Sequence, residues 1–301
     1  MYSHLKNALK RKKFLSLEVT PLHGLGVKTL IEKLSATKLP SKTDAFIITD
    51  NPLARLKSSS IITAVKLQEY FQKPAIATLS MRDRNKIALQ ADLLGANELD
   101  VRSILALSGD SAAASDQPNV KGVFEANSQL LLEIIRCFNA GLDYSGKPFA
   151  YPPKPINSFA VCNAKAQNPK SLQKKIAAKL RFTPLGIISQ PVYSLENAKL
   201  LKEIFENAKS ELADCQTELI FGFFPVTKLR TAQFLDSHVP GVHIPSEWKV
   251  KLELAKKIGD EEELKAGLEL SRDILKSLLD FHPKIHIMGA NNFQLLDSLV
   301  E

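Results

Sequence analysis

The stretch Ile104-Leu105-Ala106-Leu107-Ser108-Gly109-Asp110 joins an apolar run of β-strand type to a short polar signature. The same order recurs after four other apolar runs, where the polar residues are Glu18, Thr49 with Asp50, Arg82 with Asp83, and Gln190. Short apolar runs bounded in this way predict buried strands. In a barrel of parallel strands, residues that directly follow the strands share one rim, and such folds place their chemistry there.

Strand-like runs alternate with helix-like runs along the whole chain. The expected strands are residues 14–19, 45–49, 75–79, 103–108, 156–162, 185–190, 218–224 and 284–288. The expected helices are residues 27–36, 61–71, 86–97, 125–139, 170–179, 195–212, 230–237, 246–258, 260–279 and 293–300. Strands separated by helices pair in parallel with right-handed crossovers.

Eight such units in 301 residues favour an α/β fold of the closed (β/α)8 TIM-barrel type. We therefore expect residues 1–301 to form a single domain, with extra helices before the last strand. A doubly wound open sheet is the alternative architecture. It usually carries a glycine-rich turn after the first strand, and the turn Thr20-Pro21-Leu22-His23-Gly24 lacks that pattern.

The composition limits the classes of function. The net charge is +8, from 40 basic and 32 acidic residues, and apart from a cluster at residues 10–13 the basic residues are dispersed. We expect a basic N-terminal helix or arm at residues 1–13. No apolar stretch is long enough to span a bilayer, and no secretory signal is recognisable, so a cytoplasmic protein without a membrane partner is expected. Because the basic residues are dispersed, the charge does not specifically favour nucleic-acid binding. The same net positive charge also suits an anionic small-molecule ligand.

The rim residues suggest a site, although each has a simpler interpretation. Glu18 could act as a general acid if burial raises its pKa, or it could be an exposed residue at a strand end. Arg82 could bind phosphate, or it could be a solvated residue where a helix begins. Gly109 permits close backbone approach, and the Gln190 amide suits the edge of a heterocycle. Three dispersed cysteines and no histidine cluster argue against a metal site.

Several of these segments together resemble one known family. They are Ser16-Leu17-Glu18, the segments at residues 49–55 and 82–85, the stretch at 104–110, and the segments at 189–193 and 239–245. In this order, each at an expected strand end or loop, they resemble the methylenetetrahydrofolate reductases, especially the branch fused to homocysteine methyltransferase domains. The resemblance implies a barrel that holds FAD and reduces 5,10-methylenetetrahydrofolate to 5-methyltetrahydrofolate in methionine synthesis. It also implies ping-pong hydride transfer from NADH or NADPH, and a homo-oligomer, either a dimer or a tetramer.

The resemblance also assigns roles to individual residues. Glu18 matches the general acid, and Asp110 matches a carboxylate beside the flavin and the pterin. The remaining assignments form two sets: Thr49, Arg82, Ser108, Gly109, Asp110, Asn163 and Lys175 for the cofactor, and Gln190 and Leu235 for the substrate. Four segments depart from the family pattern: Thr20-Pro21, the turn at 163–167, the segment at 180–184, and the loop Ser111-Ala112-Ala113-Ala114, which stands where the family has a proline-rich segment. The alternatives are a non-catalytic homologue that binds flavin or folate, and a basic barrel that binds nucleic acid.

Overall fold

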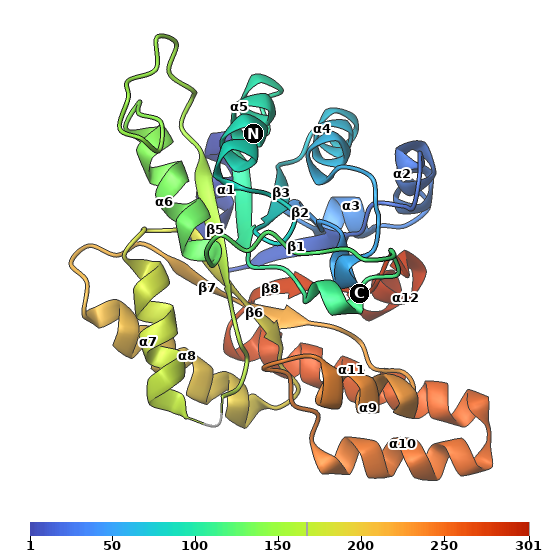
Figure 1. Cartoon of the computed structure of the whole chain (residues 1–301). Coiled ribbons are helices and arrows are strands. Elements are labelled where there is room, and N and C mark those ends of the chain that lie inside the picture. Colours follow the sequence, from blue (N-terminus) through green and yellow to red (C-terminus); the bar gives the residue numbers. More distant parts are fainter. Residues whose placement is uncertain (167, 301) are drawn as a thin grey trace.

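The structure, a computed structural model, describes residues 1–166 and 168–300. Strands β1 to β8 form a closed barrel in chain order; every neighbouring pair is parallel, and β8 pairs with β1 (Figure 1). The predicted (β/α)8 barrel is therefore confirmed, and the open sheet is excluded. The strands are Phe14–Val19 (β1), Ala45–Ile48 (β2), Ala75–Ser80 (β3), Ser103–Leu107 (β4), Asn157–Cys162 (β5), Gly186–Pro191 (β6), Glu218–Phe223 (β7) and Lys284–Ile287 (β8).

Helices surround the barrel. They are Tyr2–Lys10 (α1), Val27–Ser35 (α2), Leu39–Lys42 (α3), Ser60–Phe71 (α4), Lys86–Glu98 (α5), Ser128–Asn139 (α6), Pro169–Leu180 (α7), Leu195–Ser210 (α8), Leu229–His238 (α9), Ser246–Ile258 (α10), Asp260–Phe281 (α11) and Phe293–Leu299 (α12). Two 3-10 turns, Pro52–Ala54 (η1) and Ala112–Ala114 (η2), lie in loops. The extra helices predicted before the last strand are α10 and α11, which lie side by side at the lower right of Figure 1.

Alternating side chains divide each strand between two cores. Along β1, Leu15 and Leu17 pack outward in the large core between barrel and helices. Phe14 belongs instead to a second core inside the barrel, and Ser16 and Glu18 share its face of the strand because side chains alternate with period two. Residues on this inner face that lie near the carboxyl ends of the strands are therefore available to form a site.

Helix α1 closes the other end of the barrel. Its buried residues Leu5, Ala8 and Leu9 belong to the inner core, whereas its lysines stay exposed. The buried Lys284 Nζ fixes this end of the barrel, because it donates to the Leu9 carbonyl at 2.6 Å and pairs with Glu218 at 2.7 Å. The segment predicted as a basic helix or arm is thus a helix that seals the barrel with its apolar face.

Candidate active site

A cavity of about 290 Å³ lies where the carboxyl ends of the strands meet. Six residues predicted for the site line it, namely Glu18, Thr49, Arg82, Gly109, Asp110 and Gln190. They come from strands and loops that are distant in the sequence, and the closed barrel brings them together. The apolar part of the wall is formed by Ile47, Leu105, Leu107, Val161, Ile188 and Met288. The cavity therefore combines a hydrophobic wall with a few polar groups, as small-molecule sites do.

Glu18 is the acidic group on the inner face of β1. Burial raises its pKa from 4.5 to about 7, although hydrogen bonds from the backbone of Gly289 and Ala290 act in the opposite direction. A carboxyl group with a pKa near 7 is protonated in a large fraction of molecules at neutral pH, and this suits it to donate a proton. The environment of Glu18 therefore favours a general acid over an ordinary residue at a strand end.

His286 and Ser16 face the interior of the barrel, close to Glu18 along the strands. The strand register places Ser16 opposite His286, and the Ser16 Oγ lies 3.0 Å from His286 Nδ1. Burial lowers the pKa of His286 to about 4, so its imidazole is neutral at physiological pH. His286 also lines the cavity, although it is not among the residues predicted for the site. The alternation along β8 carries the signal, since His286 is flanked by outward-facing isoleucines.

Thr49 presents a buried hydroxyl group that lacks a hydrogen-bond partner. Within residues 1–166 and 168–300, no polar group pairs with its Oγ1. A buried polar atom left unpaired is costly, and in native structures such atoms commonly await a ligand or a water molecule. Because Thr49 lines the cavity, its hydroxyl group is available to a polar atom of a ligand there.

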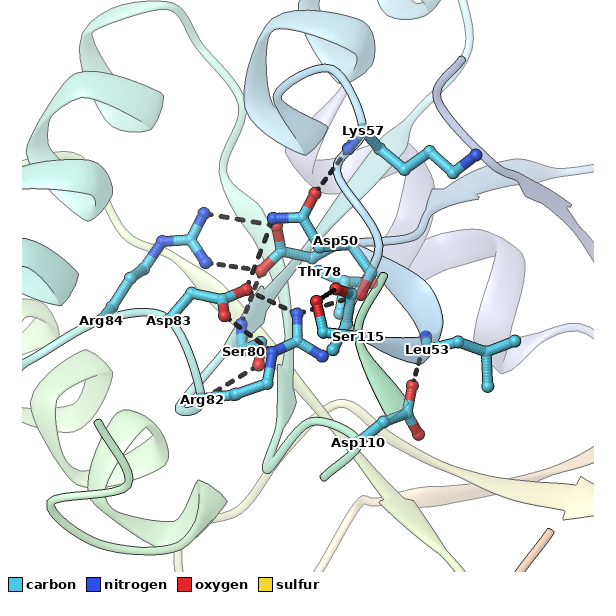
Figure 2. Close-up of polar contacts among 12 residues, drawn as sticks. Asp50, Leu53, Lys57, Thr78, Ser80, Arg82, Asp83, Arg84, Asp110 and Ser115 are labelled. Carbon is cyan, nitrogen blue, oxygen red and sulfur yellow. Dashed lines mark hydrogen bonds and ion pairs between the residues drawn. The ribbon is translucent and has the colours of Figure 1, made fainter. Parts of the chain in front are cut away.

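Arg82 is held rigidly at the edge of the cavity (Figure 2). Its guanidinium group donates to Asp83 at 2.7 and 2.6 Å, and its Nη2 also donates to the backbone carbonyl of Asn51 at 3.0 Å. These contacts raise the pKa of Arg82, chiefly through the hydrogen bond with Asp83. The neighbouring Arg84 is paired separately, with Asp50 at 2.5 Å. Arg82 is therefore held at the edge of the cavity in an ion pair with Asp83.

Gly109 allows Asp110 to reach the mouth of the cavity. Its φ is +91°, and a Cβ there would lie 2.3 Å from the Ser80 Oγ and 2.9 Å from the Arg82 Cβ. A side chain at this position would collide with the end of β3. Asp110 follows directly; it is exposed, and its Oδ2 accepts a hydrogen bond from the Leu53 N–H at 2.6 Å (Figure 2).

Four residues predicted for the site lie outside the cavity lining, namely Ser108, Asn163, Lys175 and Leu235. The Ser108 Oγ accepts a hydrogen bond from the Ser128 N–H at 3.3 Å, where α6 begins. Asn163 packs against Gly241, Lys175 is exposed on α7, and Leu235 is buried in the large core. The structure therefore does not bring these four into contact with the cavity, and their binding roles stay predictions.

Helix α9 covers the cavity with two residues that were not predicted for the site. Phe234 and His238 line the cavity, and their rings stack with centroids 5.0 Å apart and planes inclined by 10°. Val239 and Pro240, which belong to one of the segments behind the family resemblance, continue this wall. We predicted Leu235, the neighbour of Phe234, and the helical phase turns that side chain into the core instead.

Neither a metal centre nor a membrane span is found in the part of the chain that the structure describes. There, no three or more His, Cys, Asp or Glu side chains are grouped so that they could hold a metal ion. Across the same residues, every helix is too short or too polar to cross a bilayer.

Comparison with models of known protein families shows to which family the chain belongs. The family model described as methylenetetrahydrofolate reductase matches residues 3–301. The chain belongs to the methylenetetrahydrofolate reductase family. The family resemblance inferred from the rim segments is thus confirmed, and members of this family are typically flavin-dependent. No curated protein matches the chain in sequence.

Solved structures support the same fold for this member of the reductase family. One is described as an uncharacterized protein from Clostridium thermocellum that binds two copies of 5-methyl-5,6,7,8-tetrahydrofolic acid. It has a TM-score of 0.66 and 15% identity, and the match covers 98% of this chain and 97% of that chain. DmoA from Hyphomicrobium sulfonivorans has a TM-score of 0.61 and 9% identity, with 97% and 86% covered. At these identities the likeness concerns the barrel fold.

Proposed function

We propose that this protein reduces 5,10-methylenetetrahydrofolate to 5-methyltetrahydrofolate with FAD as cofactor and NADH or NADPH as electron donor. The observation that carries the proposal is the convergence of Glu18, Asp110 and Gln190 on one cavity, together with the pKa of about 7 at Glu18. Membership of the reductase family supports the same chemistry.

The residues around the cavity fit the ring system of a flavin. The unpaired Thr49 hydroxyl group offers a hydrogen bond to a polar ring atom, and the apolar wall suits the face of a planar ring. Gly109 lets the Ser80 and Arg82 side chains pack closely against the end of β4, and the Arg82 guanidinium group, paired with Asp83, lies at the edge of the same cavity. When bound, FAD would take two electrons from the reduced nicotinamide and deliver them to the folate as hydride.

Glu18 supplies the proton that this reduction requires. The methylene group of the substrate bridges two nitrogen atoms, and one of these C–N bonds must break before the carbon can accept hydride. Protonation of the leaving nitrogen by the Glu18 carboxyl group makes that bond easier to break. The overall reaction then consumes one hydride and one proton, and the bridging carbon becomes a methyl group.

Asp110 and Gln190 orient and stabilise the substrate in this proposal. Opening of the bridge generates a cationic carbon–nitrogen centre, which the Asp110 carboxylate would stabilise by its negative charge. The Gln190 amide carries a donor and an acceptor, so it can pair with the edge of the pterin ring. Phe234 lies over the same cavity, where it would exclude water from the reacting atoms.

Purified protein tests this proposal directly. We expect a yellow preparation, or a colourless one that becomes yellow with FAD, and we expect it to oxidise NADH or NADPH with menadione as acceptor. It should then reduce 5,10-methylenetetrahydrofolate when menadione is replaced by the folate. A protein that cannot be reconstituted with FAD would contradict the proposal.

A second candidate is a folate-binding homologue without catalysis. The cavity, at about 290 Å³, lies at the lower end of the volumes typical for ligand sites, and this favours one ring system over two stacked ones. The neighbour from Clostridium thermocellum is described as binding 5-methyltetrahydrofolate, which would be the product of the proposed reaction. Two measurements separate the candidates. In calorimetric titration, the binder would take up that compound in the absence of flavin. In the nicotinamide oxidation assay, the binder would show no activity.

A further inference from the structure

The loop between β2 and α4, residues 51–57, folds over the mouth of the cavity in a strained conformation; we call it the strap. Three of its residues have positive φ without being glycine, namely Asn51 (43°), Leu53 (56°) and Ala54 (55°). Such conformations are unfavourable for side chains with a Cβ and persist only where surrounding contacts hold them. The strap is therefore kept in place by its neighbours.

Three hydrogen bonds tie the backbone of the strap to the rim (Figure 2). Arg82 Nη2 donates to the Asn51 carbonyl at 3.0 Å, and the Leu53 N–H donates to Asp110 at 2.6 Å. The Ser115 hydroxyl group donates to the Ala54 carbonyl at 2.7 Å. Two of these three partners, Asp110 and Ser115, belong to the segment that follows β4.

The contacts of this segment form a closed ring. From Asp110 the chain passes through η2 to Ser115, then by hydrogen bond to Ala54, and from Leu53 by hydrogen bond back to Asp110. The 3-10 turns η1 and η2 pack against each other inside this ring. One oxygen of the Asp110 carboxylate is thereby fixed by the strap, although the side chain is otherwise exposed.

We propose that Ser115 is a positioning residue for folate reduction. Its hydroxyl group holds the strap, and the strap in turn orients the Asp110 carboxylate toward the cavity through the Leu53 N–H. This inference rests on the proposed function, in which Asp110 stabilises the cation of the opened bridge.

The first experiment measures the strap without any cofactor or substrate. Amide hydrogen exchange of residues 51–57 is compared in the wild type, Ser115→Ala and Ser111→Ala. Ser111 is the matched control, because among the residues that the structure describes its Oγ hydrogen-bonds only with the Ala113 N–H, and not with the strap. We expect exchange at Leu53 to become roughly fivefold to tenfold faster in Ser115→Ala, the scale of one lost hydrogen bond, and to stay unchanged in Ser111→Ala.

The second experiment measures the two half-reactions by stopped-flow. We expect Ser115→Ala to slow the oxidation of reduced flavin by folate about tenfold, and Asp110→Asn to slow it more, since a positioning residue acts through the residue that it orients. Flavin reduction by nicotinamide should stay within about twofold of the wild type in Ser115→Ala. Ser115→Thr keeps the hydroxyl group at a partly exposed position and should restore both exchange and folate reduction.

The outcomes separate this inference from the proposed function. Unchanged exchange at Leu53 in Ser115→Ala overturns the anchoring role, whether or not the protein reduces folate. Faster exchange with an unchanged folate step, in a protein where Asp110→Asn slows that step, overturns the positioning role alone. A protein in which Asp110→Asn leaves the folate step unchanged contradicts both the proposed use of Asp110 and the positioning role.

Discussion

The Ser16 hydroxyl group lies 3.0 Å from His286 Nδ1, inside the barrel and on the same face of β1 as Glu18. The titratable groups His286 and Glu18 both lie on this inner face. Burial lowers the pKa of His286 to about 4 and raises the pKa of Glu18 to about 7. Both groups therefore favour their neutral forms in the folded protein. Each shift has a measurable consequence for stability, and the two consequences have opposite signs.

For His286, the folded protein binds fewer protons than the unfolded chain between about pH 4 and pH 6.5. Stability contributed by this residue is therefore present above pH 6.5 and is lost as the pH falls through that window. His286→Gln removes the titration, so the free energy of unfolding of the variant, relative to the wild type, should rise as the pH falls from 7 to 4.5. Urea unfolding at several pH values measures this difference. A difference independent of pH would mean that His286 is protonated in the folded state as readily as in the unfolded chain.

For Glu18, the folded protein binds more protons than the unfolded chain between pH 4.5 and about pH 7. The free energy of unfolding of the wild type should therefore fall as the pH rises through this window, by on the order of 3–4 kcal/mol at about 1.4 kcal/mol per pKa unit. Glu18→Gln should gain stability over the wild type as the pH rises from 4.5 to 7.5, the opposite trend to His286→Gln. The same urea series measures it. Parallel trends in the two variants would show that the assigned shift of Glu18 is wrong.

Gly109→Ala tests the close approach of the ends of β3 and β4. The added Cβ would meet the Ser80 Oγ at 2.3 Å, in a backbone with φ +91°. We expect a loss of roughly 2 kcal/mol or more in the free energy of unfolding, together with weaker binding of ligands at the cavity. Gly146→Ala is the control, because Gly146 also has a positive φ but a Cβ there meets no atom. Equal melting temperatures of the two variants would argue against the steric constraint at Gly109.

Leu5→Ala tests whether α1 seals the barrel. Leu5 is fully buried in the inner core, so its truncation leaves a cavity beneath the strands. Substitutions of this kind cost about 2–5 kcal/mol, whereas Lys6→Ala on the exposed face should cost less than about 0.5 kcal/mol. Thermal unfolding compares the two variants. Similar small effects would indicate that α1 is a loosely attached arm, the other form expected for residues 1–13.

The sequence predicted the barrel and six of the residues that line the cavity, because both follow from one simple pattern. Apolar runs followed by polar residues locate the strand ends, and barrel closure then brings Glu18, Asp110 and Gln190 together. Which side of a helix faces the site is harder to predict: Phe234 lines the cavity, whereas its neighbour Leu235 is buried in the large core. The alternation along β8 indicates that His286 faces into the barrel, but only the register between β1 and β8 places it opposite Ser16.

Other features carry no local signal in the sequence. The strap has left-handed backbone conformations at Asn51, Leu53 and Ala54. A glycine at these positions would have indicated such conformations in the sequence. The contacts that hold these conformations come from distant residues such as Ser115. Lys175 and Asn163 were assigned by family resemblance, and that resemblance does not specify how the loops of this chain place their side chains relative to the enclosed cavity.

Glu18→Gln, followed through both half-reactions by stopped-flow absorbance, tests most directly whether these residues form one catalytic site. We expect flavin reduction by nicotinamide to remain within about threefold of the wild type, and we expect the folate step to slow by about 10²-fold or more, the scale of a lost general acid. Equal loss in both half-reactions, or an unchanged folate step, would contradict the assignment of Glu18 as the proton donor.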